Sequence, residues 1–233
     1  MKADILAVGA HPDDIEIGMG GTIAKAAANG KTVVMAHLTK AELSSNGSVE
    51  ERLKESAAAA KVLGAEKPLS YSFSDRGLLN ERKEAIAALV KLIREVKPVH
   101  IFAPYHEDRH PDHGHCGEIV KEAFFSAGIK KYGEGESFKP EALYYYQING
   151  LIKPDFAIDI SAFMNQKYEA LACFASQFQS GKNKVETPLT NGYLDDLRAR
   201  DRLLGRETGV SSAEGFVSER LLLYPFPEKE NKE

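Results

Sequence analysis

Two short stretches of the chain combine histidines with carboxylates, side chains that often bind a catalytic metal ion. The first, residues 9–16, reads GAHPDDIE, and the second, residues 108–113, reads DRHPDH. Imidazole and carboxylate groups together form a ligand set suited to zinc or ferrous iron. We therefore predict that the two stretches, which lie far apart along the chain, meet in space and bind one divalent metal ion.

His11 and His113 are the imidazole candidates, and a neighbouring aspartate would supply a carboxylate. Because Asp13 and Asp14 are adjacent, their side chains point in different directions if the backbone is extended there. One of the two can then bind the metal while the other stays free beside it. A free carboxylate next to a metal-activated water is suited to act as a general base, which predicts a hydrolytic site with one open metal position.

Two further residues of the second stretch could take part in this chemistry. His110 precedes the helix that we predict from residue 111 onward, and it could polarise a substrate carbonyl or protonate a leaving amine. Asp112 could orient an imidazole from behind. The apolar side chains of the same helix recur at a spacing that places His113 on the inward face of its first turn.

Each stretch follows an apolar run that reads as a buried strand, and strands and helices alternate along the chain. The predicted strands span about residues 4–9, 32–38, 69–73, 99–103, 142–147, 156–160 and 221–224. The predicted helices span about residues 17–28, 49–63, 80–96, 111–127, 161–177 and 193–206. This alternation predicts an α/β sandwich with a mostly parallel sheet. Ligands bind beyond the carboxyl ends of such strands, which is where both stretches fall.

The composition limits the classes of function. The 233 residues carry a formal net charge of -4 and show no basic stripe, which argues against a nucleic-acid partner. The two cysteines form no metal-binding or disulfide pattern, and no apolar run reaches the ~20 residues that a membrane-spanning helix needs. No signal peptide precedes the first predicted strand. We expect a single domain over residues 1–233 and a cytoplasmic protein.

At residues 10–16 and 110–113 the sequence resembles the zinc-dependent N-acetylglucosaminyl deacetylases of the PIG-L/LmbE family. The likeness to the branch of that family that acts in bacillithiol biosynthesis lies in residues 43–47, 75–78, 103–109 and 187–193. The resemblance implies a Rossmann-like three-layer sandwich and a homohexamer. It also implies a hydrolase that removes the N-acetyl group from a small-molecule partner, N-acetyl-α-D-glucosaminyl L-malate.

Carried over position by position, the resemblance makes His11, Asp14 and His113 the ligands of a Zn²⁺ ion and Asp13 the general base. It makes His110 the residue that stabilises the tetrahedral intermediate. In this mechanism zinc lowers the pKa of a water to about 7, and Asp13 takes the proton as the hydroxide attacks the acetamide carbonyl. A proton then passes to the departing sugar amine.

Three residues are candidates for substrate binding. The resemblance aligns Arg52 with a substrate-contacting arginine and Tyr193 with a mobile tyrosine near the site. Arg52 and Arg109 are also our candidates for binding a malate carboxylate, because a guanidinium group can pair with a carboxylate through two hydrogen bonds.

Several alternatives stay open. A ferrous-iron oxygenase could use His11, Asp13 and His113 as a two-histidine, one-carboxylate triad, although such enzymes usually have all-β folds. A non-catalytic sugar-binding protein on the same fold would need no general base. A related deacetylase could act on diacetylchitobiose or another N-acetyl sugar. Asp13 could also serve only as the cap of the following helix.

Overall fold

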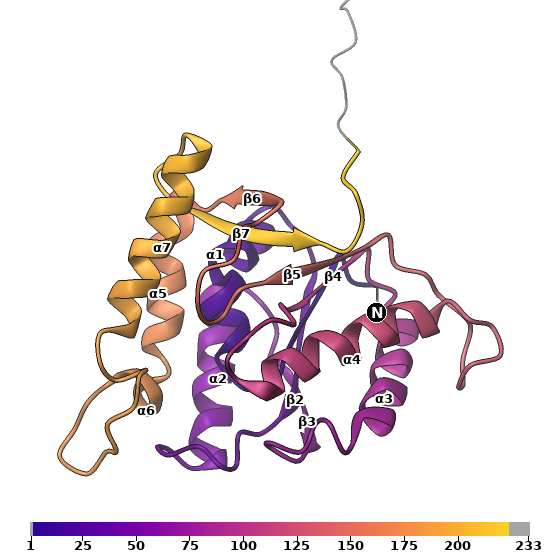
Figure 1. Ribbon diagram of the computed structural model, residues 1–233, viewed down its shortest axis with the longest axis horizontal. Coiled ribbons are helices and arrows are strands. Elements are labelled where there is room, and N and C mark those ends of the chain that lie inside the picture. Colours follow the sequence, from indigo (N-terminus) through magenta and orange to yellow (C-terminus); the bar gives the residue numbers. More distant parts are fainter. Residues whose placement is uncertain (1, 224–233) are drawn as a thin grey trace, which may run out of the picture.

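The apolar runs of the sequence form one seven-stranded sheet in the computed structural model, which describes residues 2–223. The strands are β1 (Ile5–Gly9), β2 (Val33–Thr39), β3 (Leu69–Phe73), β4 (His100–Pro104), β5 (Ala142–Tyr146), β6 (Phe156–Asp159) and β7 (Ala213–Ser218). The helices are α1 (Asp14–Ala28), α2 (Val49–Leu63), α3 (Arg82–Val96), α4 (Pro111–Ala127), α5 (Met164–Ala172), α6 (Ala175–Phe178) and α7 (Tyr193–Thr208), with a 3-10 turn at Ser161–Phe163. Helices cover both faces of the sheet, which confirms the predicted Rossmann-like three-layer sandwich (Figure 1). None of the helices within residues 2–223 has the length and apolar character needed to span a membrane.

The strand order brings the two stretches predicted to bind the metal, residues 9–16 and 108–113, side by side. The sheet runs β3-β2-β1-β4-β5-β7-β6, in which β1 to β5 pair as parallel strands and β7 is antiparallel to both of its neighbours. After β3 the chain returns to the centre of the sheet, where β4 pairs with β1 and Ile101 lies opposite Leu6. The order therefore reverses between β1 and β4. In open α/β sheets such a reversal leaves a crevice at the carboxyl ends of the two strands.

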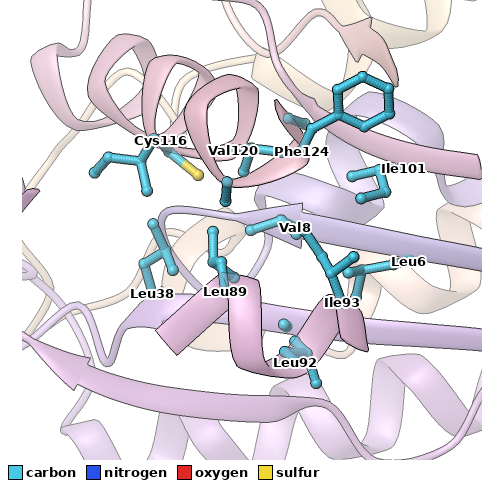
Figure 2. Close-up of a cluster of buried hydrophobic side chains, with 14 of the residues drawn as sticks. Leu6, Val8, Leu38, Leu89, Leu92, Ile93, Ile101, Cys116, Val120 and Phe124 are labelled. Atoms are coloured by element: carbon cyan, nitrogen blue, oxygen red, sulfur yellow. The ribbon is translucent and has the colours of Figure 1, made fainter. Parts of the chain in front are cut away.

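Successive residues of a strand point to opposite faces, so the central strands contribute to two hydrophobic cores. Leu6 and Val8 of β1 pack with residues of α3 and α4, among them Leu89, on one face of the sheet (Figure 2). Ile5 and Ala7 belong to the other core, with residues of α1, α2 and α5. Packing on both faces holds the central strands rigidly, and the loops of the site extend from their ends.

Helix α2 spans the predicted residues because both of its ends carry strong local signals. Ser48 Oγ accepts a hydrogen bond from the Glu51 N–H at 3.1 Å, and the Glu51 carboxylate accepts one from the Ser48 N–H at 3.4 Å. This reciprocal capping box satisfies two backbone donors that have no partner within the helix. Gly64 ends the helix in the left-handed conformation, with φ 78°. The first turn of α2 thereby places Arg52 at the crevice.

Helix α1 begins at Asp14, earlier than predicted, so residues 14–16 of the first stretch lie in its first turn. Asp13 occupies the N-cap position with φ 111°, a left-handed conformation that is strained for a residue with a Cβ atom. Its side chain makes no capping hydrogen bond, so the interpretation of Asp13 as a mere helix cap is wrong. One turn further on, Gly18 lets the helix lie close to the sheet, because a Cβ atom there would overlap the ring of Tyr146.

Two predictions for the C-terminal part of the chain are wrong. The helix expected over residues 161–177 is divided into the 3-10 turn, α5 and α6. The last strand is β7, and residues 221–223 form no strand; residue 224 lies outside the described residues. The pattern of apolar residues is misleading here, because β7 contains the charged Glu214, which is buried, whereas Leu221 and Leu223 are apolar but exposed.

Candidate active site and metal centre

A cavity of about 480 Å³ lies beyond the carboxyl ends of the parallel strands. Its wall is formed mainly by loops that follow β1 to β5 and by residues 187–189 of a later loop. The volume is in the range of pockets that bind small molecules. All of the predicted site residues except Asp112 contribute to this wall: His11, Asp13, Asp14, Arg52, Arg109, His110, His113 and Tyr193.

The three predicted histidines lie together in the wall. The ring centroids of His11 and His113 are 5.3 Å apart, and the His110 ring lies 4.9 Å from the first and 4.6 Å from the second. Each ring offers a nitrogen within 4.8 Å of the others, close enough for a shared ion. His11 follows β1, whereas His110 and His113 follow β4, so the pairing of these strands brings them together. The two stretches therefore meet as predicted.

Asp14 connects the imidazoles of His11 and His113. Its Oδ1 lies 3.1 Å from His113 Nε2, and its Oδ2 lies 3.5 Å from His11 Nδ1. Atoms bound to one tetrahedral ion at ~2 Å lie roughly 3.3 Å apart, so these separations suit a common ligand set. Asp14 Oδ2 also accepts backbone N–H hydrogen bonds from Ala10 and His11, at 2.9 and 2.8 Å. Although burial alone would raise it, the pKa of Asp14 is held well below its usual range by the two neighbouring imidazoles.

Each of these two imidazoles has another carboxylate on the far side of its ring. His113 Nδ1 lies 3.1 Å from Asp108 Oδ1, and Asn149 donates to the Asp108 carboxylate from its backbone and side-chain amides, both at 3.0 Å. His11 Nε2 lies 3.2 Å from Asp75 Oδ1. A ring N–H that donates to a carboxylate leaves the other nitrogen available for a metal, which is the usual arrangement of metal-binding histidines. The available atoms are then His11 Nδ1 and His113 Nε2.

A second group of possible metal ligands shares His11 with the first and adds Asp75 and Asp112. His11 Nε2 faces Asp75 Oδ1 at 3.2 Å and Asp112 Oδ2 at 3.7 Å. Asp112 is only 1% exposed, accepts a hydrogen bond from the Arg76 N–H and is not part of the cavity wall. This residue is therefore placed to orient the His11 imidazole from behind, and a molecule in the cavity would not touch it.

Asp13 lies in the cavity wall and forms an ion pair with Arg52, whose Nη2 is 2.9 Å from Asp13 Oδ2. The Arg52 guanidinium also donates to the Pro12 carbonyl and, through Nη1, to Ser44 Oγ at 3.1 Å. Arg52 is only 4% exposed, and its guanidinium is engaged by these contacts within the protein. Burial raises the pKa of Asp13 to about 6, against the opposing effect of the Arg52 charge. A carboxyl group whose pKa lies near neutrality can accept and release a proton readily.

The remaining predicted residues complete the wall. The ring of His110 stacks on that of His113, and its Nδ1 is buried with no hydrogen-bond partner within residues 2–223. Burial lowers the pKa of His110, and the neighbouring His11 and His113 lower it further. Tyr193 begins α7, and its hydroxyl donates to the Ile148 carbonyl at 3.0 Å. Arg109 is exposed.

Three residues of the site were not assigned from the sequence. Asp75 and Asp108 lie behind the two imidazoles, and each follows the carboxyl end of a strand, which was the available signal. Glu16 is fully buried in the first turn of α1, and neither carboxylate oxygen has a hydrogen-bond partner among the described residues. Burial raises the pKa of Glu16 to about 8. Its signal was an acid that follows Asp13 and Asp14 but lies between Ile15 and Ile17, where an apolar segment begins.

The donor atoms fit a catalytic divalent metal. Two imidazole nitrogens and one carboxylate are the three protein ligands of many catalytic zinc sites, in which the fourth position is left for water or substrate. Ferrous iron accepts a similar set. The carboxylates behind the imidazoles of His11 and His113 supply the outer hydrogen bonds that such sites require. The arrangement therefore suits metal-assisted chemistry on a small molecule held in the cavity.

Known proteins are similar to this chain in sequence and in fold. Residues 6–124 match the model of the PIG-L family, which is described as GlcNAc-PI de-N-acetylase. The diacetylchitobiose deacetylase of Thermococcus kodakarensis is 31% identical over 225 residues, or 91% of this chain and 81% of that protein. The solved structure of a conserved protein from Thermus thermophilus is similar with a TM-score of 0.87 and 37% identity, over 96% of this chain and 97% of that one.

One relative is named for a different reaction. The 4-oxalmesaconate hydratase of Pseudomonas putida is 26% identical over 246 residues, or 95% of this chain and 89% of that protein. One fold can thus carry more than one reaction, and the side chains of the site have to decide between them. The family itself follows from the match over residues 6–124 and from the 31% identical relative. This chain belongs to the PIG-L family of GlcNAc-PI de-N-acetylases.

Proposed function

We propose that the protein is a zinc-dependent deacetylase of N-acetylglucosamine-containing sugars and that its substrate is N-acetyl-α-D-glucosaminyl L-malate. The observation that carries this proposal is the position of Asp14 between His11 and His113, with Asp13 in the wall of the same cavity. A metal site beside a carboxylate that can accept a proton is what the hydrolysis of an amide requires. The diacetylchitobiose deacetylase among its relatives supports the class of substrate. The malyl group rests on the resemblance of residues 43–47, 75–78, 103–109 and 187–193 to one branch of the family.

In this proposal His11, Asp14 and His113 hold the zinc ion. Bound zinc would supply a water with a pKa of about 7 and polarise the acetamide carbonyl. Asp13 accepts the proton of the attacking water and passes a proton to the sugar nitrogen as the C–N bond breaks. One water is consumed for each amide bond, and the products are acetate and the free amino sugar.

His110 stabilises the negative charge that develops on the acetamide oxygen. Its ring is held between two neighbours, stacked on His113 and edge-on to His11, so it is positioned before the reaction begins. A preorganised donor of this kind is worth roughly 3–4 kcal/mol of barrier height. Asp112 contributes indirectly, because it lies behind His11 and fixes that ring.

We assign substrate contacts to Arg52, Arg109 and Tyr193, which line the cavity. The Arg52 guanidinium also pairs with Asp13, so this residue has the further task of holding the general base in place. A single domain over residues 1–233, a cytoplasmic location and a homohexamer complete the proposal. The first two rest on the composition and organisation of the sequence, and the homohexamer rests on the resemblance.

The proposal is tested by steady-state kinetics of the zinc-reconstituted protein on three sugars. We expect the highest kcat/KM on N-acetylglucosaminyl malate, with lower values on diacetylchitobiose and free N-acetylglucosamine. Equal kcat/KM values on all three sugars would contradict the assignment of the malyl substrate and would be consistent with a general sugar deacetylase. No release of acetate from any of them would overturn deacetylation itself.

The metal and the reaction class are tested separately. Zinc-loaded protein assayed without air should release acetate at its full rate, because the proposed chemistry uses no oxygen. Activity that requires ferrous iron and air would favour the oxygenase alternative instead. A hydratase assay on a small unsaturated dicarboxylate, run with the same zinc-loaded sample, should show no turnover.

A further inference from the structure

Two of the three arginines in the cavity wall have no ion-pair partner within residues 2–223. Each wall carboxylate faces a basic group: Asp13 faces Arg52, Asp14 faces two imidazoles and Asp75 faces His11. The wall also contains Arg76 and Arg109, and within residues 2–223 neither guanidinium forms an ion pair or a hydrogen bond. A divalent metal would add further positive charge. The cavity therefore has two cationic groups for which the described part of the protein supplies no anion.

Arg52 cannot be one of a pair of free anion-binding groups. It is 4% exposed and already contacts Asp13, the Pro12 carbonyl and Ser44. Binding a substrate carboxylate there would compete with the ion pair to the general base. The anion-binding task predicted for Arg52 is therefore better suited to an arginine that is both exposed and unpaired.

Arg76 meets these conditions and is held in place by its backbone. It has φ 63°, a left-handed conformation that is unfavourable for arginine, and its N–H donates to Asp112 Oδ2. The turn is closed by a hydrogen bond of 2.9 Å from the Gly77 N–H to the Ser74 carbonyl. Strain of this type persists only where the surroundings enforce it, and it is frequent at ligand sites. The exposed Arg76 side chain thus starts from a fixed point at the cavity.

Arg109 starts from an equally fixed point. It lies between Asp108, which backs His113, and His110, whose N–H donates to Asp108 Oδ1 at 2.8 Å. Asp75, the neighbour of Arg76, contacts His11 in the corresponding way. Both arginines therefore extend from residues directly adjacent to those that position the metal-binding histidines.

We propose that Arg76 and Arg109 form an anion-binding site for the carboxylates of the substituent attached to the sugar. This inference rests on the proposed function and deepens it. Two guanidinium groups match a small dicarboxylate, because each can pair with one carboxylate through two hydrogen bonds. The site selects sugars with an anionic substituent over neutral ones, while the metal and Asp13 act on the acetamide of both.

The test compares kcat/KM for N-acetylglucosaminyl malate with that for neutral methyl N-acetyl-α-D-glucosaminide. For Arg76→Ala and Arg109→Ala we expect the ratio of the two values to fall about 10-fold each, and about 100-fold for the double variant, in line with hydrogen bonds to charged groups. Arg76→Lys should restore only part of the ratio, since lysine cannot pair through two nitrogens. Arg202→Ala, an exposed arginine of α7 outside the cavity wall, is the matched control and should leave the ratio unchanged. An unchanged ratio in the double variant would overturn the anion site.

A binding measurement separates this inference from the proposed function. Calorimetry with metal-free protein should detect N-acetylglucosaminyl malate and show a loss of about 10-fold or more in the double variant, with binding weaker at high salt. If no sugar is deacetylated but this difference persists, the deacetylase proposal fails and the anion site stands. If acetate is released while wild type and double variant bind the malyl sugar equally, the anion site fails and the deacetylase stands.

Discussion

Asp108 Oδ1 lies 3.1 Å from His113 Nδ1, on the opposite side of the ring from Nε2, which faces Asp14. This contact fixes both the orientation of the ring and the nitrogen that carries the proton. We expect Asp108→Ala to lower zinc affinity by about 10- to 100-fold, the usual effect of removing such a partner. Competition with a chromophoric chelator measures it. Asp196→Ala, an exposed carboxylate of α7, is the control, and equal affinities for the two variants would contradict the role of Asp108.

Asp13→Asn distinguishes a general base from a metal ligand. If Asp13 only accepts and delivers protons, the variant should retain one zinc ion per chain while kcat falls by about 10²- to 10⁴-fold. Metal content by mass spectrometry and the rate of acetate release give the two numbers. Loss of the metal together with the activity would instead support the triad of the oxygenase alternative, in which Asp13 is a ligand.

Gly18→Ala should destabilise the protein severely. The new Cβ atom would overlap the ring of Tyr146, which is fully buried and whose hydroxyl donates to the Val8 carbonyl at 2.7 Å. Overpacking of this kind costs about 3 kcal/mol, or more where the ring cannot move. Gly30→Ala has open space around it and a φ of 73°, so only a backbone cost of about 1 kcal/mol is expected. Urea unfolding of both variants gives the comparison, and similar midpoints would disprove this account.

Lys167 is a fully buried ammonium group that faces two carboxylates, Asp201 at 2.7 Å and Glu214 at 2.8 Å. Lys167→Met would leave Glu214 without a countercharge and Asp201 with only Arg200, whose Nε lies 3.9 Å from Asp201 Oδ1. We expect it to lower the free energy of unfolding by about 3–5 kcal/mol. Asp201→Asn should cost less, because the pair of Lys167 and Glu214 remains. Chemical denaturation at neutral pH measures both, and a larger loss for Asp201→Asn would refute this order.

The same cluster predicts a pH dependence of stability. Burial raises the pKa of Asp201, Lys167 opposes the rise, and Glu214 adds to it. Above the ordinary aspartate pKa of ~3.9, the folded protein therefore holds this proton more tightly than the unfolded chain does, so stability falls as pH rises toward the raised pKa. Asp201→Asn removes this contribution. The difference in free energy of unfolding between wild type and variant should therefore decrease as pH rises across that window. A difference that increases with pH would mean that folding lowers the pKa of Asp201 instead of raising it.

Much of the central fold was predictable from local patterns. Strands β1 and β4 were indicated by short apolar runs, and the start of α2 by its capping residues Ser48 and Glu51. These signals depend only on residues close together in the sequence, and the structure places the three elements where they were predicted. The meeting of His11 with His113 followed from one general property of parallel sheets, namely that loops after neighbouring strands share an edge.

Other features depend on contacts between distant residues, which a single sequence does not display. The Asp13–Arg52 ion pair joins the N-cap of α1 to α2, so Arg52 is not a free cation in the cavity. Strand β7 was not predicted because it contains the charged Glu214. This charge is stabilised in the core by Lys167 and by the N–H groups of Gly21 and Thr22, all far away in the chain. The break between α5 and α6 likewise contains no glycine or proline that would have indicated it in the sequence.

The side chains proposed to hold the metal and those that shape the outer wall come from separate loops. The wall contains residues 41, 43–46 and 187–189, none of which is a proposed metal ligand. These two loops are joined by Asn46, whose side chain donates to the Val185 carbonyl at 2.8 Å and accepts from the Val185 N–H at 2.9 Å. Grafting only one of them from a relative would break this link, whereas transplanting both together could redirect the enzyme to a new sugar and leave its chemistry intact.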